Sequence, residues 1–163
     1  MSLPHTPSFR LDGRRALVVG AGRGIGAAAA AALVEADAAV TLAARSRPDL
    51  EAVAAELGTR GQPAQVLPLD VTDAAAVCAA LADSAPFDIF VNSAGTNRPA
   101  QLVDTRDEDL VAVLELNVLA MFQLTREVAR GMITAGRGGS IITVSSQMGR
   151  VGGPSVPPSS KPP

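Results

Sequence analysis

The chain has 163 residues, of which 47% are hydrophobic and 18% are charged, a balance typical of one globular domain with a sizeable core. The formal net charge of −2 provides no basic surface and argues against nucleic acid or a membrane as a partner. Charged residues interrupt every long apolar run, so we expect no transmembrane helix. The only cysteine, Cys78, cannot form an internal disulfide, which favours a cytoplasmic location, and its alanine-rich surroundings predict a buried thiol.

Apolar runs alternate with helical patterns along most of the chain. The runs predict strands at residues 15–20, 39–44, 65–69, 87–91 and 140–145. The intervening patterns predict helices at residues 24–36, 49–57, 72–82 and 106–134. Pro68 places the third strand at an edge, because proline cannot donate a hydrogen bond to a ladder. Short buried strands separated by helices predict an α/β fold, a Rossmann-type doubly wound parallel sheet with strand order 3-2-1-4-5.

A glycine-rich turn lies between the first strand and the first helix, with the spacing Gly20-x3-Gly24-Ile25-Gly26 rather than G-x-G-x-x-G. At this place glycine bends the chain tightly and lets a phosphate group approach the free N–H groups of a helix N-terminus. An ordinary glycine-rich turn is the alternative. The strand and helix on either side favour a pyrophosphate site.

The glycine spacing resembles the cofactor motif of the classical short-chain dehydrogenase/reductase family, and four further segments match that family in the same order. They are Leu69-Asp70-Val71-Thr72, Asn92-Ser93-Ala94-Gly95, Leu116-Asn117-Val118 and the strand ending in Ser145-Ser146. The resemblance implies a dinucleotide-binding Rossmann domain over residues 9–153. Together with two arginines near the turn, it predicts these cofactor-binding residues: Gly20, Arg23, Gly24, Ile25, Gly26, Arg45, Asp70, Val71, Asn92, Ala94, Gly95 and Val118.

Some of these residues have a structural alternative. Asp70 could cap the following helix, although Thr72 and Asp73 are better placed for that role. Asn92 could tie neighbouring strands together by hydrogen bonds. Asn117 lies in an apolar part of a helix, where an amide is unfavourable without a partner, and this favours a buried functional role.

The residues after the second strand indicate the cofactor. NAD-selective sites place an acid near the end of this strand to bind the ribose hydroxyls. Here the segment Ala43-Ala44-Arg45-Ser46-Arg47 has no acid before Asp49, and Asp37 precedes the strand and belongs to the opposite edge of the sheet. Arg45 and Arg23 can bind a 2′-phosphate, unless both are only solvated surface residues. NADP(H) is therefore the favoured cofactor, with NAD(H) as the alternative.

The family resemblance implies catalysis by an asparagine, a serine, a tyrosine and a lysine. Asn117 and Ser146 match the first two, and a turn-forming serine is the alternative for Ser146. The chain has no tyrosine, and the family's spacing from Ser146 places neither a tyrosine nor a lysine where they are required. A register with a two-residue deletion places Pro157 in the tyrosine position and Lys161 in the lysine position. A Ser-His-Asp triad is not expected, because the only histidine is His5, and no Cys/His cluster predicts a metal site.

The two ends of the chain differ in character from its centre. Residues 1–8 lack the basic-then-apolar order of a signal peptide and are predicted to be a flexible tail. Residues 154–163 contain five of the twelve prolines and can form neither a helix nor a central strand. We therefore expect a fold that is incomplete at its C-terminus, in a chain truncated or altered after residue 153.

Three functions remain open from the sequence. The first is an NAD(P)-dependent oxidoreductase that interconverts a small-molecule secondary alcohol and a ketone. The second is a noncatalytic or degenerate NAD(P)-binding protein, since the tyrosine is missing, and the third is an interaction protein that keeps only the scaffold. Apolar residues around the helix at 106–134 exceed what one sheet face covers, and with the family resemblance they predict a homodimer or homotetramer.

Overall fold

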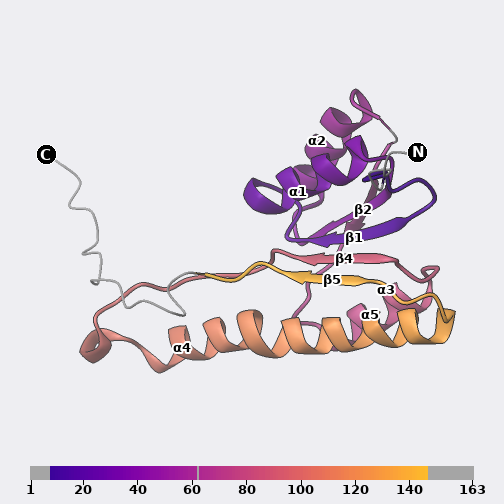
Figure 1. Ribbon diagram of the computed structural model, residues 1–163. Coiled ribbons are helices and arrows are strands. Elements are labelled where there is room, and N and C mark those ends of the chain that lie inside the picture. Colours follow the sequence, from indigo (N-terminus) through magenta and orange to yellow (C-terminus); the bar gives the residue numbers. More distant parts are fainter. Residues whose placement is uncertain (1–7, 62, 147–163) are drawn as a thin grey trace, which may run out of the picture.

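The computed structural model describes residues 8–61 and 63–146 (Figure 1). The predicted segment at 154–163, Lys161 and all of the tail except Ser8 lie outside this part. The strands form one parallel sheet with the order β3-β2-β1-β4-β5, so the predicted topology is confirmed. The elements follow the chain as β1 Arg15–Val19, α1 Gly24–Glu35, β2 Ala39–Ala44, α2 Arg47–Gly58, β3 Gln65–Pro68, α3 Ala74–Ala82, β4 Ile89–Asn92, η1 Leu102–Asp104, α4 Asp107–Leu114, η2 Glu115–Ala120, α5 Met121–Ala135 and β5 Ser140–Thr143.

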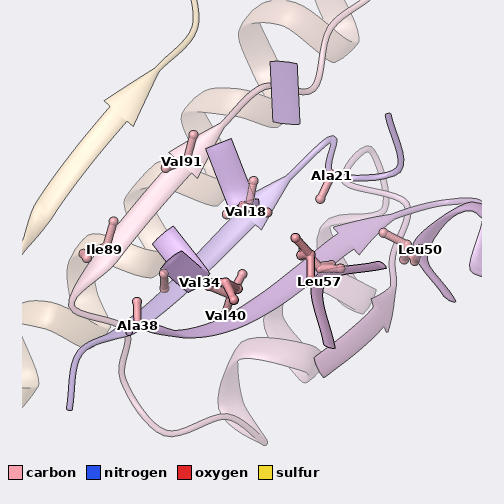
Figure 2. Close-up of a cluster of buried hydrophobic side chains, with 12 residues drawn as sticks. Val18, Ala21, Val34, Ala38, Val40, Leu50, Leu57, Ile89 and Val91 are labelled. Carbon is pink, nitrogen blue, oxygen red and sulfur yellow. The ribbon is translucent and has the colours of Figure 1, made fainter. Parts of the chain in front are cut away.

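Helices cover the sheet on both faces (Figure 1). On one face Val18 of β1 packs in a cluster with Val34 of α1 and Leu57 of α2 (Figure 2). On the other face Phe90 of β4 packs in a second cluster with Leu124 of α5. These five side chains are at most 3% exposed. Because successive strand residues point to opposite faces, each central strand contributes to both clusters, which fix the strand ends relative to one another.

The starts of the first three helices differ in a way that matters for the site. In α2 the Ser46 hydroxyl accepts a hydrogen bond from the Asp49 N–H at 3.4 Å, and in α3 the Asp73 carboxylate accepts one from the Ala76 N–H at 3.0 Å. Helix α1 begins at Gly24 with no side-chain cap and no acidic residue in its first turn. The positive end of the α1 dipole is therefore not compensated by a side chain of its own first turn.

The predicted continuous helix at residues 106–134 changes its hydrogen bonding near its middle. Helices α4 and α5 flank η2, which is π-helical. Asn117 lies within η2, and its side chain bonds to the backbone of Thr96, which is 21 residues away in the chain. A π-helical turn is wider than an α-helical one and is frequent at functional sites. The sequence therefore predicted the position of the long helix correctly but did not predict its π-helical turn.

Predictions about exposure were partly wrong. Cys78 is exposed rather than buried, because it follows the buried Val77 by one helix position and so points away from the sheet. On the long helix, Leu110 and Phe122 are exposed, but Leu124 is 1% exposed and belongs to the core. Self-association through this helix stays a prediction.

Asp88 lies at the edge of the sheet where β1, β4 and β5 begin, and its side chain links residues beside these strands. Its carboxylate is 5% exposed, and Oδ2 accepts a hydrogen bond from the Arg15 N–H at 2.9 Å. The guanidinium groups of Arg14 and Arg137 lie 3.3 and 3.7 Å from Oδ1. The Arg15 N–H is the main cause that lowers the pKa of Asp88, and the two arginines add to it while burial opposes it.

Replacing Asp88 with asparagine should lower the free energy of unfolding by about 2–3 kcal/mol at neutral pH, because a buried, charge-assisted network is broken. The pKa of Asp88 is lowered on folding, so its stabilisation is present above the unfolded pKa near about 3.9 and is lost as pH falls through the folded pKa. Urea denaturation from neutral to acid pH should therefore show a weaker acid dependence in Asp88→Asn. Asp83→Asn, at the exposed end of α3, is the control. An acid dependence equal to that of the wild type would contradict this role.

Candidate functional site

A cleft of about 680 Å³ lies where β1, β2, β3 and β4 end. Strand β1 lies between β2 and β4, so the chain leaves these strands in different directions and a crevice opens at their carboxyl ends. The volume is in the range of small-molecule and cofactor sites. The lining residues come from the segments after these strands and from the junction of α4 with η2: Val19, Gly20, Gly22, Arg23, Gly24, Ile25, Ala44, Arg45, Ser46, Asp49, Leu69, Asp70, Val71, Thr72, Ser93, Ala94, Gly95, Thr96, Arg98, Ala112, Glu115 and Leu116.

The glycine turn forms one wall of the cleft and leads directly into the uncapped end of α1. The N–H groups of Gly20 and Ala21 donate to the Ala43 carbonyl at 2.8 and 3.2 Å, which fixes the turn to the end of β2. Gly24, the first residue of α1, has a φ of +57° and open space where a Cβ atom would lie. Bare backbone, open space and an uncompensated helix N-terminus together fit a pyrophosphate group.

The end of β2 brings charged side chains to the same cleft. Arg45 and Arg23 are both exposed and both line it, and their binding of a 2′-phosphate stays a prediction. Asp37 lies before β2 and forms an ion pair with Arg10, so it is remote from this edge, also as predicted. Asp49, on the first turn of α2, lines the cleft as well.

Asp70 follows β3 and lines the cleft, but its carboxylate also shapes the local chain. Oδ1 accepts hydrogen bonds from the N–H of Thr72 at 3.0 Å and from its hydroxyl at 2.7 Å. These bonds are the main cause that lowers the pKa of Asp70, and Arg45 adds a smaller effect. Helix α3 is capped by Asp73 instead. Asp70 is therefore a negative group of the cleft at neutral pH, held in place by Thr72.

Two amide side chains shape the segment after β4. Asn92 is 3% exposed, and its Oδ1 accepts a hydrogen bond from the Ala94 N–H at 3.1 Å. Asn117 forms a pair of bonds with one backbone unit: Oδ1 accepts from the Thr96 N–H at 2.9 Å, and Nδ2 donates to the Thr96 carbonyl at 2.8 Å. The Asn92 side chain thus forms a hydrogen bond within its own segment rather than to a neighbouring strand. Asn117 links η2 to the backbone of Thr96, which lines the cleft.

Among the predicted site residues that the structure describes, five do not line the cleft: Gly26, Asn92, Asn117, Val118 and Ser146. Gly26 packs beneath the turn against Gly20. Val118 is 49% exposed on η2. Ser146 follows β5, where the Val144 N–H still donates to the Asn92 carbonyl, so this segment leaves the sheet beside the segment after β4. The catalytic roles of Asn117 and Ser146 and the cofactor role of Val118 stay predictions.

Sequence reasoning missed several residues of the cleft. Asp49 was noted only as too late in the chain to serve as the acid after β2, and no binding role was predicted for Thr96, Arg98, Glu115 or Leu116. The spacing places Asp49 on the first turn of α2, but its contact with Gly22 is set by packing, and no local signal indicates it. The other four depend on how the long helix packs against the loop after β4.

Within residues 8–61 and 63–146, no group of three or more His, Cys, Asp or Glu side chains is arranged to hold a metal ion. No helix in the same part of the chain is long and apolar enough to cross a bilayer.

Comparisons with known proteins agree with this geometry. The sequence model of the short chain dehydrogenase family matches residues 14–161. Galactitol 2-dehydrogenase of Rhizobium johnstonii is 40% identical over 156 residues, which cover 91% of this chain and 59% of that protein. Gluconate 5-dehydrogenase of Gluconobacter oxydans is 36% identical, with 92% of this chain and 61% of that protein covered. The chain thus spans about three fifths of the length of these curated relatives.

Solved structures show the same likeness in three dimensions. A gluconate 5-dehydrogenase from Burkholderia cenocepacia, crystallised with NADP and tartrate, has a TM-score of 0.83 and 37% identity, covering 91% of this chain and 60% of that one. A short-chain type dehydrogenase/reductase from Mycobacterium marinum has a TM-score of 0.86 and 35% identity, covering 90% of this chain and 61% of that one. The glycine turn, the parallel sheet and the family match over residues 14–161 lead to one conclusion: the chain belongs to the short-chain dehydrogenase family.

Proposed function

We propose that this protein is an NADP(H)-preferring oxidoreductase that interconverts a secondary alcohol and a ketone on a small polyhydroxylated substrate. The observation that carries the proposal is the cleft in which the uncapped N-terminus of α1 meets Arg23 and Arg45. The relatives named for galactitol and gluconate support a polyol or sugar acid as the substrate class. The single cysteine supports a cytoplasmic location.

The residues present fit a nicotinamide dinucleotide. The backbone N–H groups at the start of α1 would hold the pyrophosphate, Asp70 and Val71 the adenine end, and Arg45 a 2′-phosphate. Bound there, the nicotinamide ring supplies or accepts a hydride. The protein itself positions the reactants. Asn117 fixes the Thr96 backbone at the wall of the cleft, and Ser146 is the predicted hydrogen-bond donor to the substrate oxygen.

A second candidate function follows from the absence of tyrosine among the 163 residues. A noncatalytic protein would use the same cleft to bind the dinucleotide without transferring a hydride. Both candidates require cofactor binding, whereas a pure interaction scaffold does not. Cofactor affinity therefore separates the first two from the third, and turnover separates the first from the second.

Replacing Arg45 with aspartate should weaken NADPH binding by about 1.5–3 kcal/mol, the free energy of a charge-assisted hydrogen bond to phosphate. Isothermal calorimetry with NADPH and with NADH measures the effect, and the affinity for NADH should change much less. Arg47→Asp is the matched control, because Arg47 is two residues away, 62% exposed, ion-paired with Glu51 and absent from the cleft lining.

The ratio of the two affinities decides the outcome. If the ratio of the affinities for NADPH and NADH is unchanged in Arg45→Asp, Arg45 is only a solvated surface residue. If the wild-type chain bound neither nucleotide, both dinucleotide-dependent functions would be rejected for it.

A further inference from the structure

We propose that Asp49 sets the balance between the two nicotinamide dinucleotides in this cleft. Its carboxylate accepts hydrogen bonds from the adenosine ribose hydroxyls of NAD(H) and repels the 2′-phosphate of NADP(H). The inference rests on the proposed function, because it concerns the same nucleotide. It also differs from the expectation from the sequence, in which the residues after β2 include arginines but no acid close enough to bind the ribose hydroxyls.

The fold places Asp49 at the start of α2 and beside Gly22 of the glycine turn. It is the third residue of α2, where its N–H bonds to the Ser46 hydroxyl at 3.4 Å. Its side chain reaches the glycine turn: the Asp49 Cβ atom lies 3.2 Å from the point where a Cβ atom on Gly22 would lie, and Oδ2 lies 3.9 Å from that point. Asp49 lines the cleft together with Arg23, Arg45 and Ser46. The first turn of α2 thus brings Asp49 to the glycine turn, although Arg45 precedes the helix.

The charges in this part of the cleft have opposite effects on the binding of a 2′-phosphate. Arg23 and Arg45 favour a phosphate, whereas the exposed Asp49 carboxylate opposes one. Two other acids line the cleft: Glu115, which belongs to η2, and Asp70, whose Oδ1 already accepts hydrogen bonds from Thr72. A ribose diol, in contrast, donates hydrogen bonds to a carboxylate, and this is how NAD-binding sites of this fold use an acid. Asp49 is therefore the group that weakens NADP(H) binding and supports NAD(H) binding.

Calorimetric titration of the 163-residue chain with NADPH and with NADH tests the proposal, since the two ligands differ only in the 2′-phosphate. Asp49→Asn removes the charge but keeps a hydrogen-bond acceptor, and Asp49→Ala removes both. We expect both variants to bind NADPH about five- to tenfold more tightly. Affinity for NADH should fall about threefold in Asp49→Asn and about tenfold in Asp49→Ala.

The control is Glu51→Gln, because Glu51 is an exposed acid on the same helix, is ion-paired with Arg47 and does not line the cleft. It should leave both affinities unchanged. A purely structural role for Asp49 would shift the two affinities together, and that result would overturn the inference while leaving the proposed function intact. Absence of nucleotide binding by the wild-type chain would instead reject the proposed function, and the inference with it.

Discussion

Replacing Gly26 with alanine should destabilise the fold by about 3 kcal/mol and abolish dinucleotide binding at accessible concentrations. A Cβ atom on Gly26 would lie 2.2 Å from the carbonyl oxygen and 2.7 Å from the carbonyl carbon of Gly20. These are backbone atoms, so no side-chain rotation relieves the clash. Either α1 moves away from the sheet or the glycine turn changes shape. A change in the turn would directly disrupt the proposed pyrophosphate site.

Urea denaturation gives the change in unfolding free energy, and NADPH titration gives the change in affinity. Gly58→Ala is the control, because Gly58 ends α2 and a Cβ atom there meets nothing within 4 Å. It should leave both measurements within about 0.5 kcal/mol of the wild type. A Gly26→Ala protein as stable as Gly58→Ala would mean that α1 and the turn are not packed as described.

The polypeptide of residues 1–163 should bind NADPH but reduce ketones about 10²- to 10⁴-fold more slowly than a relative with a complete catalytic set. Transfer of a hydride to a carbonyl leaves an oxyanion that needs a proton and electrostatic support. Ser146 is the predicted hydrogen-bond donor to that oxygen, but a serine hydroxyl is too weak an acid to replace a tyrosine, and the 163 residues contain no tyrosine. Oxidation of NADPH with a panel of keto sugars and keto acids measures the rate.

The same preparation needs an intact-mass measurement, because the prediction concerns this polypeptide alone. Cofactor-dependent turnover at the rate of active relatives, by material of 16.5 kDa, would contradict it. A markedly heavier chain with activity would show that residues other than these 163 complete the catalytic set.

The sequence was sufficient to predict the sheet, because its signals are local. Val18 and Phe90 lie in short apolar runs that fit only buried strands, and Pro68 indicated the edge where β3 is found. The glycine spacing then fixed which edge holds the cleft, since a phosphate site needs a helix N-terminus at the end of a strand. The alternation of strands and helices predicted parallel strands, and the strand order followed from this alternation and the place of the glycines.

The features that the sequence did not predict depend on contacts between distant segments. The wide turn at η2 accompanies the pairing of Asn117 with the Thr96 backbone, and no local pattern indicates that pairing. Asp49 reaches the cleft because the first turn of α2 lies against Gly22, a contact set by packing rather than by spacing in the chain. Cys78 was misjudged because alanine neighbours do not reveal which face of α3 meets the sheet.

The central claim is that a nicotinamide dinucleotide binds at the carboxyl edge with its pyrophosphate at the start of α1. Titration of isotope-labelled protein with NADPH, followed by amide ¹H–¹⁵N NMR, tests it most directly. We expect the largest amide shifts at Gly24, Ile25 and Gly26, with smaller ones at Arg45 and Ala94. Saturating NADPH that leaves the amides of Gly24 to Gly26 unmoved, or that instead shifts residues around Asp88 and Arg137 at the opposite edge, would contradict it.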